Sequence, residues 1–441
     1  MKKCYYLFGA LAITVMVGCS SDEVVQQQTP ESLQTKHAIT ISPTSVGATR
    51  SQVFNSTSDL TSFMVIALAE GAVDHQDHFW IGGEDIEAGA DAAGYMPYVN
   101  QFGDDGIQEV VYSNKGWNFR DGKTRYWAYK QIKEGNQITG YECLPMTFRA
   151  YTPTNLNSAY ENAAKFLKKG ASFEQDLFVY NATLDENNNN AIIPGTPVPV
   201  SKMQDICFAA KSNATSAGGA VQLEFKHAFS QIVFAAKKTS NYEVDIKAIE
   251  IGGMKYAGCM YFDKYSLQEE WHGDMADGLT YYPGFASLTP ISLTSFADDK
   301  PVQLTEAGQE LILMPQVVTA WDPVNEKAVK KGTGEPKGGY VSVTFRYRLA
   351  GTSKWITGGD NVDGYETTYF PLKAKWVKGK KYVYTLLFGG ATNPSDNTDP
   401  NDNPSPGDGY DENGTPKAPS VAITFLPTVT NWQITDVNIK Q

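Results

Sequence analysis

The densest group of potential metal ligands in the sequence is the run Asp74-His75-Gln76-Asp77-His78. Imidazole and carboxylate side chains both bind zinc, so His75 and His78 could hold an ion if a further ligand came from elsewhere in the fold. The run lies in a polar stretch, and its spacing matches neither a helical HExxH pair nor a paired CxxC site. A solvated loop is the stronger interpretation, and we predict that the chain binds no metal and no cofactor.

Sequence motifs for covalent catalysis or phosphoryl transfer are also missing from the chain. It contains no GxSxG nucleophile elbow and no GxxxxGKS or GxxxxGKT phosphate-binding loop. A glycosidase would need two facing carboxylates in a cleft, a pair that sequence cannot reveal and that no motif here suggests. We therefore predict that the protein is not an enzyme, and a secreted carbohydrate-active enzyme is the weakest of the alternatives.

Three other groups of residues are candidates for a chemical role, and for each of them a structural role is the stronger expectation. His227 falls on the apolar face of an alternating stretch, where a hydrogen-bonded core histidine is commoner than a functional one. The acidic loops at 360–363 and 396–411 lack the ligand spacing of an EF-hand, and the second contains prolines typical of a linker. Indole rings can stack on sugars but more often pack in a core or an interface; the candidates are Trp271, Trp321, Trp355 and Trp376.

The composition indicates a folded, acidic chain of more than one domain. Its 441 residues exceed the size of one ordinary core, and 41% of them are hydrophobic. The formal net charge of −12 at pH 7 repels phosphate backbones, which makes nucleic acid an unfavourable partner. Cys143, Cys207 and Cys259 fit no metal or disulfide framework, so we expect buried thiols, although one pair could be oxidised.

The N-terminus carries the features of an export signal. Lys2 and Lys3 precede an apolar run over 5–17, which is shorter than the roughly 20 residues that span a bilayer. The run ends in Gly18-Cys19, which resembles the lipobox of bacterial lipoproteins. We predict a lipoprotein signal peptide over 1–18 and a palmitate-type lipid on Cys19 that holds the chain in the outer membrane, at the cell surface, until it is processed. The alternative is an ordinary signal peptide with an incidental cysteine.

The rest of the sequence reads as many short strands separated by turn signals. Apolar residues alternate with polar ones over 37–42, 221–229 and 340–347, which is the pattern of half-buried strands. The best helix candidate is 158–167. Many strands with few short helices predict an all-β fold of the sandwich type.

Changes in composition suggest how the chain is divided. A polar tether and a first strand occupy 19–50, and we expect one β-sandwich over 51–215 and a second over 216–392. The Asn/Asp/Pro-rich stretch 393–419 cannot bury a core and is predicted to be a flexible linker. Residues 420–441 supply the last strands.

Several segments together resemble the fimbrillin family of Bacteroidetes, the subunits and accessory proteins of type V pili. They follow the family's order over most of the chain after the signal peptide, although nothing in residues 69–125 matches. The clearest are the lipobox, Ala48-Thr49-Arg50, Asp176-Leu177-Phe178, Leu223–Ile232, Leu313–Gln316, Tyr382–Leu386 and the terminal Ile423 with Trp432. The resemblance implies two tandem transthyretin-like, Greek-key type β-sandwiches and no catalytic activity. It also implies a structural subunit or tip adhesin of a pilus that serves cell adhesion.

The resemblance further implies how such a subunit would assemble. The family is exported as a lipoprotein and then cut after an arginine in an early loop, which here corresponds to the bond between Arg50 and Ser51. The cut releases the N-terminal strand that contains Ile39 and Ile41, and a strand from a neighbouring subunit fills the groove.

Strand addition of this kind gains main-chain hydrogen bonds and buries alternate side chains. The C-terminal segment is the better donor candidate because it is apolar and follows a flexible linker. Its apolar residues are Val421, Ile423, Phe425, Trp432, Ile434, Val437 and Ile439. The alternative, left open here, is that this segment pairs within its own domain, as a last strand normally does.

The expected partners follow from this reading. They are other pilus subunits in a homo- or heteropolymer, the membrane through the lipid on Cys19, and host or bacterial surface glycans or proteins. The rival hypothesis is a solitary surface lipoprotein that binds glycans through exposed tryptophans.

Overall fold

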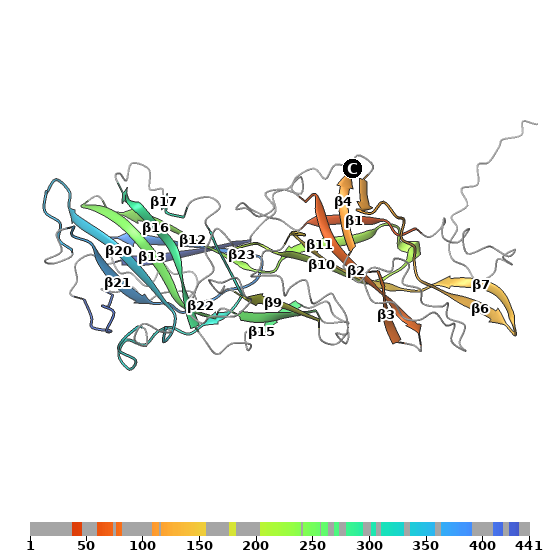
Figure 1. The fold of residues 1–441 in the computed structure, drawn as a ribbon. Coiled ribbons are helices and arrows are strands. Elements are labelled where there is room, and N and C mark those ends of the chain that lie inside the picture. Colours follow the sequence, from red (N-terminus) through yellow and green to blue (C-terminus); the bar gives the residue numbers. More distant parts are fainter. Residues whose placement is uncertain are drawn as a thin grey trace, which may run out of the picture.

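The computed structural model describes residues 38–45, 60–73, 76–81, 108–113, 116–155, 176–181, 203–239, 241–255, 257–262, 269–272, 279–293, 301–305, 310–329, 336–357, 363–389, 409–417 and 423–431. These residues form several β-sheets, and the prediction of an all-β fold is confirmed (Figure 1). Their one helical element is the 3₁₀ turn η2 (Ser216–Gly218). The helix candidate 158–167 lies outside the described residues. Among the described residues no helix is long and apolar enough to cross a membrane.

The first domain is built on one eight-stranded sheet. Along the sheet the strands are β1 (Ile41–Ser45), β11 (Val221–His227), β10 (Cys207–Ala214), β8 (Met146–Thr152), β2 (Ser62–Val73), β4 (Gln108–Ser113) and β5 (Gly116–Phe119), with β3 (Gln76–Ile81) also paired to β2. β1 and β11 are parallel, whereas the other neighbours are antiparallel. β1 also approaches β5 at the far end of the sheet path, so the sheet curls towards closure.

Alternation explains why these segments are strands. In β11 the side chains of Val221, Leu223 and Phe225 are buried while those between them are exposed. β8 is buried along its whole length because it lies in the middle of the sheet, with a core on each face. Phe148 packs into the core enclosed by the curled sheet, and Tyr151 packs into the core shared with the second domain.

Two further sheets face each other in the second domain. The five-stranded sheet contains β17 (Val302–Gln303), β12 (Ser230–Lys238), β23 (Lys380–Phe388) and β24 (Ile423–Asn431), with β18 (Leu311–Leu313) also paired to β12. The four-stranded sheet contains β16 (Leu279–Leu293), β13 (Tyr242–Lys255), β20 (Tyr340–Leu349) and β21 (Glu366–Pro371). Buried residues from both sheets, such as Ile246, Phe345 and Tyr384, belong to one hydrophobic core, as in a β-sandwich.

Three small sheets complete the described structure. They are β15 (Glu269–His272) with β14 (Ala257–Phe262) and β9 (Asp176–Asn181); β19 (Val317–Val318) with β22 (Ala374–Lys375); and β6 (Tyr129–Glu134) with β7 (Gln137–Cys143). The β6–β7 hairpin points away from the body at the end remote from the second domain (Figure 1).

The transition between the two domains lies later in the chain than the sequence suggested. The expected boundary at 215/216 falls inside the first sheet, because β10 and β11 on either side of it are paired. The polar, glycine-containing stretch between them is a tight turn in which Gly219 adopts a φ of 76°, rather than a linker. The chain changes sheet between β11 and β12, at Ala228 and Phe229, which are both fully buried.

Part of the predicted linker 393–419 is held against the second domain. Tyr410 and Tyr369 exchange two backbone hydrogen bonds of 2.9 Å, and the ring of Tyr410 packs edge-on against Trp321 at 5.7 Å. Lys417 donates a hydrogen bond of 2.7 Å to the carbonyl of Thr367. Residues 409–417 therefore anchor the chain to β21 shortly before β24 begins, and the prediction of a flexible linker remains untested for the residues before them.

Candidate functional site: the groove that holds the first strand

The chain from Ala38 to Ser45 lies between strand β11 of the first sheet and the segment that follows β5. On one side β1 pairs in parallel with β11, from Ile41 opposite Val221 to Ser45 opposite Phe225. The carbonyl of Thr40 accepts a hydrogen bond of 2.8 Å from the Val221 amide. On the other side the amide of Ile39 donates to the carbonyl of Arg125 at 2.8 Å. The first strand thus closes the curled sheet between β11 and the segment that follows β5 (Figure 1).

Alternate side chains of this segment fill the core of the first domain. Ile39, Ile41 and Pro43 are buried, whereas Thr40 is exposed and Ser42 is half-buried. Ile39 and Ile41 belong to the same core as Phe63 and Phe225. Burial of the two isoleucines contributes about 3–6 kcal/mol, so the loss of this strand would leave an apolar groove.

The proline in β1 fits the hydrogen-bonding pattern of an edge strand. In a parallel ladder, successive residues direct their N–H and C=O groups alternately to one side and the other. Because Thr40 faces β11, Ser42 and Thr44 face it too, and Ile39, Ile41 and Pro43 face away. Pro43 therefore stands where no N–H is needed for the β11 ladder.

The second wall of the groove is held by contacts that do not involve β1. The guanidinium of Arg125 is fully buried, donates to Gln108 at 2.7 Å and lies 4.3 Å from the ring centre of Phe119. Arg125 also forms an ion pair with Asp121, and this hydrogen bond lowers the pKa of the Asp121 carboxyl. The backbone at Arg125 is thus fixed by neighbours on β4, β5 and the turn after β5.

The predicted processing sites lie outside the described residues. This applies to the lipidation site Cys19 and to the cleavage site at Arg50 and Ser51. The sequence contains no arginine before Arg50, and the next one is Arg120. A cut between β1 and β2 would leave β1 held to the chain that follows by noncovalent contacts, which include the hydrogen bonds and side-chain contacts described above.

The first part of the predicted donor segment is paired within its own domain. β24 runs antiparallel to β23, from Ile423 opposite Phe388 to Asn431 opposite Lys380, and Ile423 is fully buried. Phe425 lies opposite Leu386. In the uncut chain, therefore, the last described strand pairs within its own domain, which was the alternative to its role as a donor. The other donor candidates, Val421, Trp432, Ile434, Val437 and Ile439, lie outside the described residues, and their donor role stays a prediction.

The histidines singled out in the sequence fall in different places. His75 lies outside the described residues, and His78 lies in β3 opposite Ala69. His227 is buried, and its Nδ1 lies 2.6 Å from Asp205 Oδ2 and 3.5 Å from the sulfur of Cys207. The pairing of β10 with β11 sets Cys207 opposite His227. Their separation in the sequence gave no sign of this cluster, although the strand alternation correctly placed His227 on an apolar face.

The Asp205–Cys207–His227 cluster has neither the geometry of a nucleophilic site nor a complete structural zinc site. Asp205 and Cys207 both lie against the same ring nitrogen, so the imidazole cannot pass a proton from the thiol to its other nitrogen. Burial raises the pKa of the Cys207 thiol, which disfavours the reactive thiolate. Structural zinc takes four ligands, and among the described residues the cluster has three. Its role is to join β10 and β11 through buried polar contacts.

Two of the four tryptophans proposed as sugar platforms are enclosed in the core. Trp321 and Trp376 are buried, and the indole of Trp376 donates to the Tyr384 hydroxyl at 3.0 Å. Trp271 lies in β15 opposite Met260. The half-buried Trp355 has the guanidinium of Arg346 over its ring at 4.0 Å.

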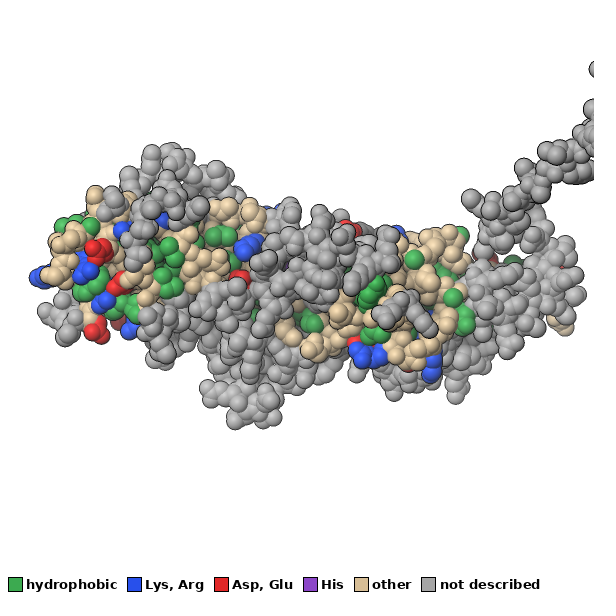
Figure 2. Space-filling view, turned by 90° about the horizontal axis from the view of Figure 1, so that it is seen from above, with side chains coloured by type: hydrophobic (Ala, Val, Ile, Leu, Met, Phe, Trp, Pro, Cys, Tyr) green, Lys and Arg blue, Asp and Glu red, His purple; other side chains and the backbone are tan. Residues whose placement is uncertain are grey.

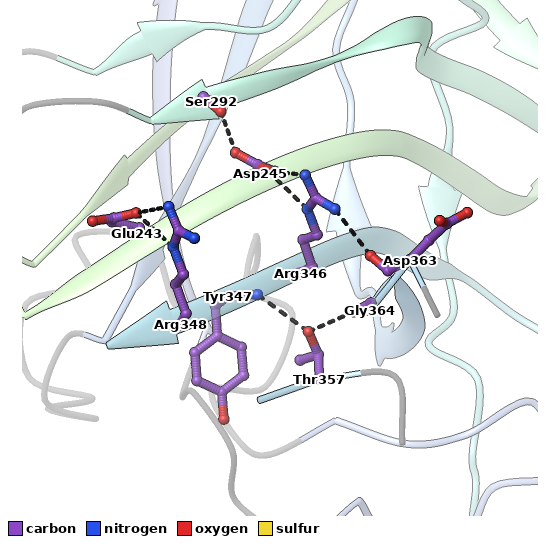
Figure 3. Close-up of polar contacts among 9 residues, drawn as sticks. All are labelled: Glu243, Asp245, Ser292, Arg346, Tyr347, Arg348, Thr357, Asp363 and Gly364. Atoms are coloured by element: carbon purple, nitrogen blue, oxygen red, sulfur yellow. Dashed lines mark hydrogen bonds and ion pairs between the residues drawn. The ribbon is translucent and has the colours of Figure 1, made fainter. Parts of the chain in front are cut away.

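The arginines near Trp355 are paired with acids on the neighbouring strand. Arg346 donates to Asp245 at 2.8 Å and to the carbonyl of Asp363 at 3.0 Å (Figure 3). Arg348 donates to Glu243 at 2.7 Å, and this hydrogen bond lowers the pKa of the Glu243 carboxyl. Figure 2 shows basic and acidic side chains interspersed at this end of the molecule. The network ties β13 to β20.

Comparison with known proteins identifies the family. A family model described as fimbrillin-like matches residues 82–402, which is more than half of the chain. A comparison of the sequence with curated proteins finds no match.

Two similar solved structures are remote in sequence. A fimbrial protein from Bacteroides vulgatus is 11% identical with a TM-score of 0.44, over 90% of this chain and 99% of that one. The tip fimbrial protein Mfa3 from Porphyromonas gingivalis, with a C-terminal truncation, is 10% identical with a TM-score of 0.27, over 88% of this chain and 98% of that one. The extent of the family match confirms the resemblance seen in the sequence, and the chain belongs to the fimbrillin-like family.

Proposed function

We propose that the protein is a structural subunit or tip adhesin of a type V pilus that serves cell adhesion at the cell surface, and that it is not an enzyme. The observation that carries this proposal is the position of β1. It is an edge strand that closes a curled sheet, buries Ile39 and Ile41, and precedes the first arginine of the sequence. A strand in this position is removable by one cut without disturbing the pairing among the other described strands.

The proposed sequence of events begins with export as a lipoprotein with its lipid on Cys19. Proteolysis between Arg50 and Ser51 then frees β1 from the rest of the chain. Its departure exposes the backbone edge of β11 and the apolar slots of Ile39 and Ile41, which is an unfavourable surface in water. A strand from a second subunit restores both the hydrogen bonds and the burial.

The test is limited trypsinolysis of the full chain without its signal peptide, followed by native gel electrophoresis. We expect cleavage after Arg50 and a ladder of oligomers. The matched control is Arg50→Gln, which should remain uncut at this bond and stay monomeric while any cleavage at lysines continues. A clean monomer after verified cleavage at Arg50 would contradict assembly by strand exchange.

The rival hypothesis of a solitary glycan-binding lipoprotein predicts that the protein stays monomeric after cleavage at Arg50. Of its candidate tryptophans, Trp321 and Trp376 are part of the core, and the ring of Trp355 is covered by Arg346. Binding of oligosaccharide by the cleaved monomer, lost on Trp355→Ala, would favour the rival over the pilus subunit.

A further inference from the structure

A buried cluster where the chain passes from the first domain to the second carries the donor atoms of a metal site. Cys207 is the first residue of β10, His227 is the last residue of β11, and Asp205 lies just before β10. All three residues are buried, with exposed fractions of 3% or less. The pairing of β10 with β11 thus brings a carboxylate, a thiol and an imidazole to one point in the interior.

We propose that Asp205, Cys207 and His227 bind one zinc ion, which the chain takes up as it folds. Three residues suffice because the carboxylate of Asp205 can bind through both of its oxygens, which with the sulfur of Cys207 and Nδ1 of His227 gives the four donor atoms of structural zinc. This inference goes beyond the proposed function and depends on neither cleavage nor assembly. It departs from the expectation that the chain binds no metal, because His227 lies 20 residues from Cys207 in the sequence and only the sheet brings them together.

The distances between the donor atoms are close to those of a zinc site. Zinc holds sulfur at about 2.3 Å and nitrogen or oxygen at about 2.0–2.2 Å, so donors from different residues of a tetrahedral site lie roughly 3.4–3.6 Å apart. Cys207 Sγ lies 3.5 Å from His227 Nδ1 and 3.8 Å from Asp205 Oδ2. Nδ1 and Oδ2 are closer, at 2.6 Å, because a hydrogen bond joins them. Replacement of its proton by zinc requires these two atoms to move apart by about 1 Å or less.

The second oxygen of Asp205 supports the proposal independently. Oδ2 already contacts both the imidazole and the thiol. Oδ1 is buried as well, and it accepts no hydrogen bond from the part of the chain that the structure describes. A buried acceptor without a partner is unfavourable, so a cation that binds this oxygen removes a cost that the hydrogen bonds of the cluster leave in place.

Zinc would also balance the charge of the cluster. The thiolate and the carboxylate each carry one negative charge, which the two positive charges of the ion offset, and a neutral group is far less costly to bury than an isolated carboxylate. Without a metal, burial raises the pKa of the Cys207 thiol, whereas a thiol that coordinates zinc loses its proton. From a neutral imidazole, the thiol proton leaves and the imidazole proton moves from Nδ1 to Nε2. Binding therefore releases one proton per zinc to the solvent.

Refolding with and without zinc tests the site in the otherwise unaltered chain. The chain without residues 1–19 is unfolded in urea with EDTA and a reductant, refolded with or without an excess of zinc sulfate, passed through a gel filtration column and analysed for metal by mass spectrometry. We expect one zinc ion per chain and a melting temperature higher by about 5 °C or more in the presence of zinc. Refolded protein that retains no zinc, or that melts at the same temperature in both cases, would overturn the inference.

A pair of serine variants locates the ion. Cys207→Ser replaces the sulfur with a hydroxyl of similar size, and its zinc affinity, measured by competition with a coloured chelator, should fall at least roughly ten-fold. Cys143→Ser removes a half-buried thiol outside the cluster and should bind zinc like the unaltered chain. Equal affinity of Cys207→Ser and the unaltered chain would show that zinc binds elsewhere and would overturn the inference.

Cadmium provides a second measurement in case Cys207→Ser does not fold. Cadmium replaces zinc in thiolate sites, and its bond to a thiolate gives a charge-transfer absorption in the ultraviolet. In the chain without residues 1–19 that also carries Cys143→Ser and Cys259→Ser, Cys207 is the one remaining cysteine. This variant, refolded with cadmium, should show the absorption. Its absence from the refolded variant would mean that Cys207 is not a ligand and would overturn the inference.

Discussion

Residues 38–45, which include β1, share five of eight residues with the repeated segment 422–429, which includes the start of β24, but the two strands lie in different ladders. β1 pairs in parallel with β11 over five residue pairs and closes the sheet of the first domain. β24 pairs antiparallel with β23 over nine residue pairs at the edge of the second domain. An alternating strand with a proline that needs no N–H partner suits either edge, so the sequence of this segment does not select one ladder. The two ladders differ in their length, in the relative direction of their strands and in the part of the core that each strand covers.

The largest expected effect is on the β1 side of this comparison. Ile41→Ala removes a buried side chain from the core around Phe63 and should lower the free energy of unfolding of the uncut chain by about 2–4 kcal/mol. Urea denaturation measures this loss, and Thr40→Ala, an exposed neighbour, is the control that should change little. After cleavage at Arg50 the same variant should form the normal ladder, because β1 is no longer part of the assembly. A defective ladder would show that β1 stays in place.

A proline in β24 should shift the balance towards exchange. Pro427 has no N–H, which indicates that odd-numbered residues of β24 face away from β23 and even-numbered ones face it. Thr430→Pro should therefore remove a hydrogen bond of the cis ladder and cost about 1 kcal/mol. Since residue 430 lies beyond the repeated segment, we expect roughly five-fold more ladder from cleaved protein at equal concentration.

The control for that variant is Val429→Pro, at an exposed position whose N–H is expected to face away from β23. It should leave the amount of ladder nearly unchanged. If both prolines act alike, the assumed alternation of β24 is wrong.

A smaller effect on assembly is expected from loosening residues 409–417, which anchor the chain to β21 before β24 begins. Tyr410→Ala removes the ring contact with Trp321 and should loosen residues 409–417, which increases the reach of the strand that follows. We expect ladder formation to become faster by a few-fold in a time course after trypsin addition, with a loss of stability of about 1 kcal/mol. Asn413→Ala, at an exposed position in the same turn, is the matched control. A slower ladder would show that the anchor helps to hold the donor near its acceptor.

The smallest effect concerns the second wall of the groove. The hydrogen bond from Arg125 lowers the pKa of Asp121, whose reference value is 3.8, so the charged carboxylate stabilises the fold. That contribution is fully present above the unfolded-state pKa and is lost as the pH falls through the lower folded-state pKa. Asp121→Asn should therefore destabilise the uncut chain by less than about 1 kcal/mol at pH 7. The difference from wild type should shrink as the pH falls below the reference value of 3.8, measured by urea denaturation at each pH. A difference that persists in acid would point to lost packing rather than lost charge.

Much of the groove could be predicted from single segments of sequence. The alternation of Ile39 and Ile41 marked a half-buried strand, and that of Val221, Leu223 and Phe225 marked the strand that receives it. The position of Arg125 in the second wall of the groove was not predictable from the sequence. Its hydrogen-bond acceptor Gln108 lies on β4 and the ring of Phe119 lies on β5, and only the folded sheet brings them together around Arg125. The likeness of residues 38–45 to residues 422–429 was visible in the sequence, but the sequence did not show that β1 pairs with β11 and β24 with β23.

The sequence by itself determined the strands, the acidic character and the membership of the fimbrillin-like family. These properties follow from local alternation, composition and motifs, which act over a few residues at a time. The tertiary structure decided which strands are neighbours, that β1 closes the first sheet, and that Asp205, Cys207 and His227 meet in one buried cluster. Strand alternation fixes which face of a strand is buried, whereas the choice of partner depends on contacts between residues far apart in the chain. For that reason one short sequence can occupy a parallel place in one domain and an antiparallel place in the other.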